Sequence, residues 1–225
     1  MNNYQKILKS SIPILLTYFL SYGIILLSIL IYFCLGYSSI DKLINILPYI
    51  LIITYLFYII YFLKKYPISI KKKNKYFPYL LLGISLSVFL NMILFYVSPP
   101  TNSKTTIPLF LDIIASGIIG PIYEELLFRH IFYNKLKSFN SKKKSLYLTT
   151  IAFALIHLTP LKMIYALFLG FILTKVYQQK ENILFPILIH VSANITSTFL
   201  FEYNTYLFFL SLISLFLGSY LVFKK

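Results

Sequence analysis

Residues 12–37 read IPILLTYFLSYGIILLSILIYFCLGY, a stretch of 26 residues without a charged side chain. A helix needs about 20 mostly apolar residues to cross the roughly 30 Å hydrocarbon core of a membrane. The stretch therefore predicts a membrane-spanning helix. Lysines precede it, as in a secretory signal sequence, but it is too long and no A-x-A-like cleavage site follows, so we expect a retained helix.

Seven further apolar runs follow the first one along the chain. They cover residues 43–63, 77–97, 107–128, 145–158, 161–174, 183–201 and 205–223. The fifth and sixth of the eight runs are short and meet at Thr159-Pro160, a pair typical of a tight turn, although one long, broken segment is an alternative. The sequence thus predicts an all-α fold, a polytopic membrane protein of about eight transmembrane helices with polar residues inside the membrane.

Composition excludes several other classes of protein. Hydrophobic residues make up 59% of the chain and charged residues 12%, whereas soluble domains carry about 25% charged residues. A soluble enzyme, a disordered chain and a secreted disulfide scaffold are therefore excluded. The single cysteine, Cys34, can form neither an internal disulfide nor a multi-cysteine zinc site. The net charge of +15 is spread between apolar runs, which favours the lipid bilayer as partner and argues against nucleic acid.

The basic residues predict how the chain is oriented in the membrane. If the N-terminus is cytoplasmic and eight spans alternate, the inner segments hold 18 of the 21 Lys and Arg residues. The outer loops hold the other three, which are Lys42, Lys104 and Lys162. Cytoplasmic loops of membrane proteins carry an excess of Lys and Arg. We therefore expect a multi-pass protein of the cell membrane with both termini in the cytoplasm.

Two adjacent acids, Glu124 and Glu125, lie in the apolar run 107–128. Ionisable residues inside a membrane are costly and indicate a functional site by default. Arg129 follows Glu125 by four residues, the favourable direction for an ion pair on one helix face. Glu124 points about 100° away around the helix and is free to face another partner. A solvated helix end is the plainer alternative, and for Asp112, near the outer end of the same run, we expect a polar anchor or cap.

Two histidines and an asparagine lie in later spans. His157 is in the fifth run, and His190 and Asn194 share one face of the seventh. Such residues often make only hydrogen bonds between helices. If the fourth helix extends through residues 131–133, however, Glu124, His157 and His190 all fall in the middle third of the bilayer. These three side chains can then meet in one water-filled pocket.

This set of side chains is suited to hydrolysis. Glu124 can act as general base toward water, and His190 and Asn194 can donate hydrogen bonds to a developing oxyanion. His157 can orient the water or donate a proton. Zinc bound by Glu124, His157 and His190 with an open fourth position is an alternative that the sequence leaves open, although no H-E-x-x-H motif occurs.

Three motifs occur in order on separate spans: Glu124-Glu125-Leu126-Leu127-Phe128-Arg129, Phe153 to His157, and His190 to Asn194. They match the patterns E-E-x-x-x-R, F-x-x-x-H and H-x-x-x-N/D. In these motifs the chain resembles the CAAX-protease and bacteriocin-processing (CPBP, Abi) family of intramembrane endopeptidases. The resemblance covers about residues 121–194, and the first three spans are recognisable only as membrane helices.

The resemblance implies a helical fold with a membrane-embedded site that opens to the cytoplasm, and a peptide or protein substrate in the membrane. The catalytic set it implies is Glu124, His157, His190 and Asn194, with Glu125, Arg129 and Phe153 in support. We accordingly divide the chain into N-terminal helices (1–106), a catalytic core (107–201) and a C-terminal helix (202–225). Two alternatives remain: a non-catalytic immunity or scaffold protein of the same family, and, less favoured, a transporter that uses Glu and His as a proton relay.

Overall fold

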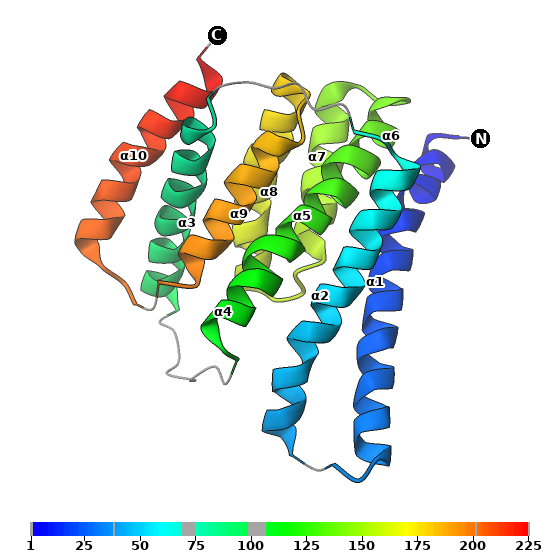
Figure 1. Ribbon diagram of the computed structural model, residues 1–225. Helices are drawn as coiled ribbons and strands as arrows, with labels where there is room; N and C mark the ends of the chain where they lie inside the picture. Colours follow the sequence, from blue (N-terminus) through cyan, green and yellow to red (C-terminus); the bar gives the residue numbers. More distant parts are fainter. Residues whose placement is uncertain (1, 38, 69–74, 99–106, 201, 225) are drawn as a thin grey trace.

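The computed structural model describes residues 2–37, 39–68, 75–98, 107–200 and 202–224. Within these ranges all regular secondary structure is helical, which confirms the predicted fold class (Figure 1). Some basic residues that enter the predicted orientation lie outside the described residues, namely Lys71, Lys72, Lys73, Lys104 and Lys225.

The chain passes through the bundle eight times. Seven passes are α1 (Asn3–Cys34), α2 (Ile40–Lys65), α3 (Phe77–Val97), α7 (Lys142–Leu155), α8 (Pro160–Lys180), α9 (Leu184–Ser197) and α10 (Thr205–Phe223). The fourth pass is a continuous helix made of α4 (Leu109–Asp112), η1 (Ile113–Ile119), α5 (Gly120–Glu125), η2 (Leu126–Tyr133) and α6 (Asn134–Lys137). The predicted end of this pass at Phe128 was wrong, and the assumed extension through residues 131–133 is confirmed.

Successive passes run in opposite directions, so both chain ends lie at the same end of the bundle (Figure 1). We call this the terminal end. The opposite end, where α1, α3 and α9 finish and α4 begins, is the distal end. Among the described residues, five helices are long and apolar enough to cross a membrane: α1, residues 42–65 of α2, α3, α8 and α10. With 14 residues each, α7 and α9 span only about 21 Å at 1.5 Å per residue.

Local sequence explains where the helices begin and end. Asn2 and Gln5 form a reciprocal capping box at the start of α1, and the Ser141 side chain accepts a hydrogen bond from the Lys144 backbone at the start of α7. Leu158 adopts a left-handed conformation (φ 58°) directly before α8 begins at Pro160. The turn predicted at Thr159-Pro160 is thus confirmed, and α7 and α8 are separate helices.

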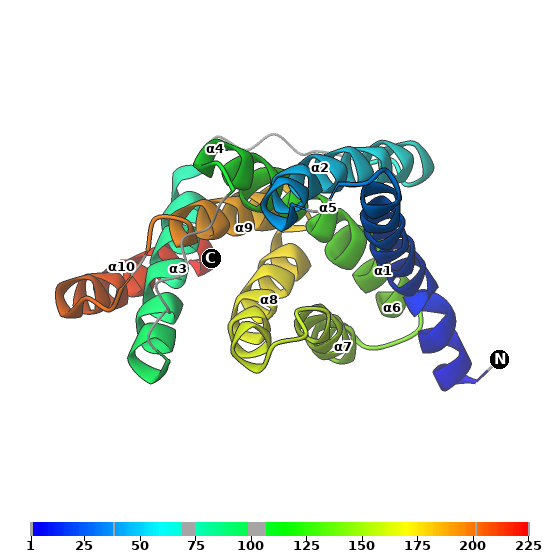
Figure 2. The same cartoon turned by 90° about the horizontal axis from the view of Figure 1, so that it is seen from below.

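The fourth pass is in contact with α1, α2, α7, α8 and α9. Figure 2 shows α3, α9 and α5 between α10 and α2, with α7 and α8 together on one side of them. A Cβ atom on Gly83 of α3 would overlap the Ser192 hydroxyl and the Ile189 carbonyl of α9, so glycine permits the close approach of these two helices. Large apolar side chains on the outer helices, such as Phe19 and Phe216, are exposed and form a surface suited to lipid.

Candidate active site

The fourth pass carries both predicted acids, and its backbone is unusual where it does so. Pro121 supplies no backbone N–H, and the preceding turns form the π-helical segment η1, in which the Gly120 N–H donates to the Ala115 carbonyl five residues earlier. A second π-helical segment, η2, follows Glu125 directly. Such segments occur often at functional sites. Here they flank the single α-helical stretch that presents Glu124 and Glu125.

Glu125 and Arg129 form the predicted ion pair. The Arg129 Nη1 atom donates to Glu125 Oε1 at 2.7 Å, and both side chains are fully buried. Arg129 Nη2 donates to the Gly170 carbonyl of α8 at 3.2 Å, and the guanidinium lies 4.3 Å from the centre of the Phe153 ring. The arginine therefore joins the fourth pass to α7 and α8, well inside the bundle.

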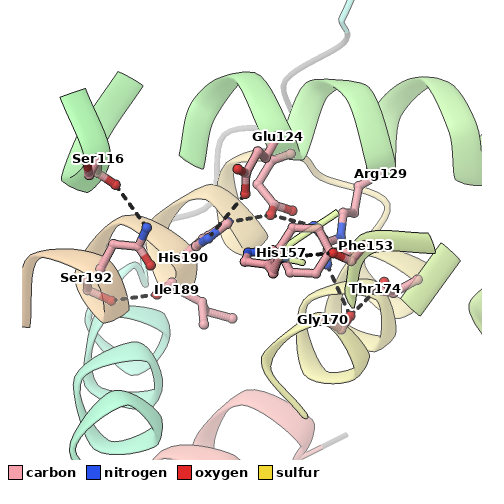
Figure 3. Close-up of polar contacts among 12 residues, drawn as sticks. Ser116, Glu124, Arg129, Phe153, His157, Gly170, Thr174, Ile189, His190 and Ser192 are labelled. Carbon is pink, nitrogen blue, oxygen red and sulfur yellow. Dashed lines mark hydrogen bonds and ion pairs between the residues drawn. The ribbon is translucent and has the colours of Figure 1, made fainter. Parts of the chain in front are cut away.

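His190 of α9 lies between the two acids. Its Nδ1 atom is 2.7 Å from Glu125 Oε1, and its Nε2 atom is 3.8 Å from Glu124 Oε2 (Figure 3). Because Glu125 Oε1 already accepts a hydrogen bond from Arg129, Nδ1 of His190 is the donor in the first contact. The orientation of the imidazole is thus fixed on one side, and its Nε2 atom is directed toward Glu124.

A hydrogen bond between Phe153 and His157 explains why these two residues of the F-x-x-x-H motif are four positions apart. The Phe153 carbonyl accepts a hydrogen bond from His157 Nδ1 at 2.9 Å, because residues four apart are neighbours on a helix. Its ring contacts the rings of His157 and His190 edge to face, at 5.0 and 5.7 Å between centroids. One buried aromatic ring therefore positions both imidazoles, and His157 retains its Nε2 atom as an acceptor.

Asn194 lies one turn beyond His190, as the sequence indicated. Its Nδ2 atom donates to the Ser116 carbonyl of η1 at 2.9 Å (Figure 3). One of its two amide hydrogens is thereby used to hold the side chain, which leaves the second for another acceptor. Asn194 thus connects α9 to the fourth pass on the distal side of the two acids.

Glu124, His157, His190 and Asn194 line one cavity of about 540 Å³. This volume lies within the range of sites that bind small ligands or short peptide segments. The Glu124 side chain is 20% exposed there, whereas that of Glu125 is not exposed at all. The four residues proposed as a catalytic set thus meet at one place, and the adjacent acids differ in their access to it.

The lining of the cavity reaches the distal end of the bundle. Its outer walls are formed by Ser98 after α3, Asp112 in the first turn of the fourth pass, Lys162 in the first turn of α8, and Thr198 after α9. Asp112, expected to be an anchor or cap, also lines the cavity. If the cavity opens at this end, a site open to the cytoplasm and cytoplasmic termini exclude each other, since the termini lie at the opposite end.

The described side chains do not form a ready-made metal site. In the described part of the chain, no three His, Cys, Asp or Glu side chains form a group that could hold one. Nδ1 of His190 contacts Glu125, and Nδ1 of His157 contacts the Phe153 carbonyl. These contacts use one nitrogen of each imidazole and leave Nε2 available as a ligand, so zinc held by Glu124, His157 and His190 stays a prediction.

Sequence reasoning missed several residues of the site. Gly170 accepts from Arg129, and a Cβ atom there would lie 2.7 Å from a Phe153 ring carbon. Tyr123, the residue before Glu124, stacks on Tyr55 of α2 at 4.5 Å between centroids and so packs the fourth pass against α2. A glycine and tyrosines in apolar runs give no signal of this kind, because their roles depend on which helices become neighbours.

The fold and the site together define a class of protein: a polytopic, all-helical membrane protein with a carboxylate–histidine site inside the bundle. Residues 106–196 match the family model described as type II CAAX prenyl endopeptidase Rce1-like. This part of the chain is thus similar to that family of endopeptidases, and the resemblance that its motifs indicated is confirmed.

The chain is also similar to part of a curated protein. The UPF0177 protein YxdF of Lactococcus lactis subsp. lactis (strain IL1403) is 35% identical over 80 residues, which cover 35% of this chain and 44% of that protein. The chain therefore spans less than half the length of this relative. No solved structure matches the chain significantly.

Proposed function

We propose that this protein is an intramembrane endopeptidase that hydrolyses a peptide bond in a hydrophobic or membrane-associated peptide. The observation that carries the proposal is the arrangement around Glu124. Its partly exposed carboxylate faces a cavity that also contains His157, His190 and Asn194, while its neighbour Glu125 is engaged by Arg129. One acid is thus available to reactants, and the other has an internal partner.

In the proposed reaction, Glu124 takes a proton from a water molecule, and the resulting hydroxide forms a bond to the carbonyl carbon of the scissile peptide. The carbonyl oxygen becomes an oxyanion. When the C–N bond breaks, the proton held by Glu124 passes to the leaving nitrogen. Water is thereby divided between the new carboxyl group and the new amine, with no covalent enzyme intermediate.

The neighbouring groups have complementary roles in this scheme. Because Nδ1 of His190 donates to Glu125, Nε2 carries a hydrogen only when the imidazole is positively charged, which suits stabilisation of an oxyanion. The free amide hydrogen of Asn194 is a second donor. His157 donates through Nδ1 to the Phe153 carbonyl, so its Nε2 atom accepts a hydrogen from the attacking water and orients it.

The proposal is tested by comparing cells that express wild type with cells that express Glu124→Gln. New peptide N-termini in the membrane and secreted fractions are identified by mass spectrometry, and the corresponding sequences are then offered as quenched fluorogenic peptides to purified protein in proteoliposomes. We expect cleavage that requires Glu124. Glu202→Gln is the matched control, because Glu202 is an exposed acid after α9 that does not line the cavity.

Two results would contradict the proposal. One is full cleavage of a verified substrate by Glu124→Gln. The other is retention of a protective phenotype when alanine replaces all four cavity residues, which are Glu124, His157, His190 and Asn194. The second result would favour a non-catalytic immunity or scaffold protein.

We further propose that both termini lie in the cytoplasm. Eight antiparallel passes support an arrangement in which both ends share one side of the membrane (Figure 1). Reporter fusions at each terminus test this orientation: alkaline phosphatase should be inactive at both ends, and a cytoplasmic fluorescent protein should be active at both.

A further inference from the structure

The residues that line the cavity extend to one side only of the site. Its deepest residues, Glu124 and His190, lie near the middle of their helices, and the other lining residues of α3, α8 and α9 all belong to the distal halves of those helices. Lys162 and Asp112 place opposite charges near the mouth. A substrate segment can therefore approach from the distal end.

The bundle is closed on the terminal side of the same site. Arg129 lies one turn beyond Glu125 in that direction, fully buried and hydrogen-bonded to two partners. Phe128, Leu173 and Ile189 surround this level of the bundle, and none of them is exposed. A substrate arriving from the terminal end would have to displace a buried ion pair and close-packed side chains.

Basic residues distinguish the two ends of the bundle. Those near the terminal end, among the described residues, are Lys6, Lys9, Lys64, Lys65, Lys75, Lys135, Lys137, Lys142, Lys143, Lys144, Lys175, Lys180 and Lys224. The described part of the distal end holds Lys42 and Lys162. Because an excess of Lys and Arg marks the cytoplasmic side, the terminal end is the cytoplasmic one.

From these observations, we infer that the cavity opens to the extracytoplasmic side of the membrane. The substrate is then an apolar peptide segment that has already crossed the membrane or emerges from its outer leaflet. A protein tail exposed only in the cytoplasm would not reach Glu124. This identification of the substrate class rests on the proposed endopeptidase activity, whereas the direction of the opening rests on the proposed cytoplasmic location of the termini and not on catalysis.

The direction is tested with single cysteines in a Cys34→Ser background. Lys162→Cys and Thr198→Cys introduce thiols near the mouth of the cavity, and Ser138→Cys introduces an exposed control thiol at the terminal end. Intact cells are treated with a membrane-impermeant maleimide, and a second sample is treated after permeabilisation. We expect the two mouth cysteines to be labelled to the same extent in both samples, and the control only after permeabilisation.

The reverse pattern, with Ser138→Cys labelled in intact cells and the mouth cysteines protected, would overturn the inference. The labelling does not depend on catalysis, since Glu124→Gln can be added to each variant without changing the side from which its cysteine is reached. Loss of Glu124-dependent cleavage with external labelling intact would remove the proposed function and leave the opening direction established. Glu124-dependent cleavage together with labelling from the cytoplasmic side would support the proposed function and overturn the opening direction.

Discussion

Replacing Arg129 by methionine should destabilise the protein strongly, because it leaves a carboxylate without its cationic partner inside the bundle. Glu125 and Arg129 are 2.7 Å apart and neither side chain is exposed. Removing one member of a fully buried ion pair costs about 3–5 kcal/mol, because the remaining charge is uncompensated. His190 still contacts Glu125, which places the expected loss near the lower end of this range.

A double-mutant cycle separates the ion pair from the loss of packing. Arg129→Met with Glu125→Leu replaces both charges by apolar groups of similar size, which is often nearly neutral for a buried pair. We expect the double variant to be more stable than the sum of the single variants predicts, with a coupling of about 2–3 kcal/mol. The free energy of unfolding is measured by SDS titration in mixed micelles.

The reasoning would be refuted if Arg129→Met unfolded at the same SDS fraction as wild type. It would be refuted equally if the two single losses simply added in the double variant. Either result would mean that the pair is accessible to water in the detergent-solubilised protein and behaves as a surface ion pair, for which less than about 1 kcal/mol is typical.

Three further predictions concern the site. Gly170→Ala places a Cβ atom 2.7 Å from a Phe153 ring carbon and should cost about 1–3 kcal/mol in unfolding free energy, whereas Gly23→Ala, with no heavy atom within 4 Å, should not destabilise the protein. Asn194→Ala should lower kcat for a verified peptide about 10²–10³-fold if its amide stabilises the oxyanion, with accumulation in membranes unchanged. Chelators should leave the cleavage rate unchanged, and purified protein should contain no stoichiometric zinc by mass spectrometry; inhibition reversed by added zinc would contradict this.

The number of passes could be predicted because a membrane imposes a minimum length on each apolar helix. The end of the fourth pass could not be predicted in the same way. Arg129 resembles a residue at a membrane boundary when the sequence is read alone, yet the structure buries it against Glu125 and Gly170. A charge that is neutralised inside the bundle and a charge in a solvated loop look the same in a sequence, because the difference depends on contacts with other helices.

The motifs identified side chains that share one cavity, but they did not give the contacts between them. Spacing within one helix predicts the pair Glu125 and Arg129, since residues four apart are neighbours. The contact of Glu125 with His190 joins residues 65 positions apart and follows only from how α9 packs on the fourth pass. The closure of the site on its terminal side is likewise a property of packing, and so no motif indicates it.

The adjacent acids explain how one helix can supply two carboxylates with different tasks. On a helix, neighbouring residues point about 100° apart, so a single turn directs Glu125 inward to Arg129 and Glu124 toward the cavity. His190 contacts Glu125 through one ring nitrogen and faces Glu124 through the other, which makes the position of the imidazole depend on both acids. Glu124 and Glu125 therefore cannot exchange tasks unless the helix rotates about its own axis. For this reason Glu125→Gln, which exchanges a charged acceptor for a weaker neutral one, should lower kcat for a verified peptide by holding His190 less firmly, while Glu124 itself remains in place.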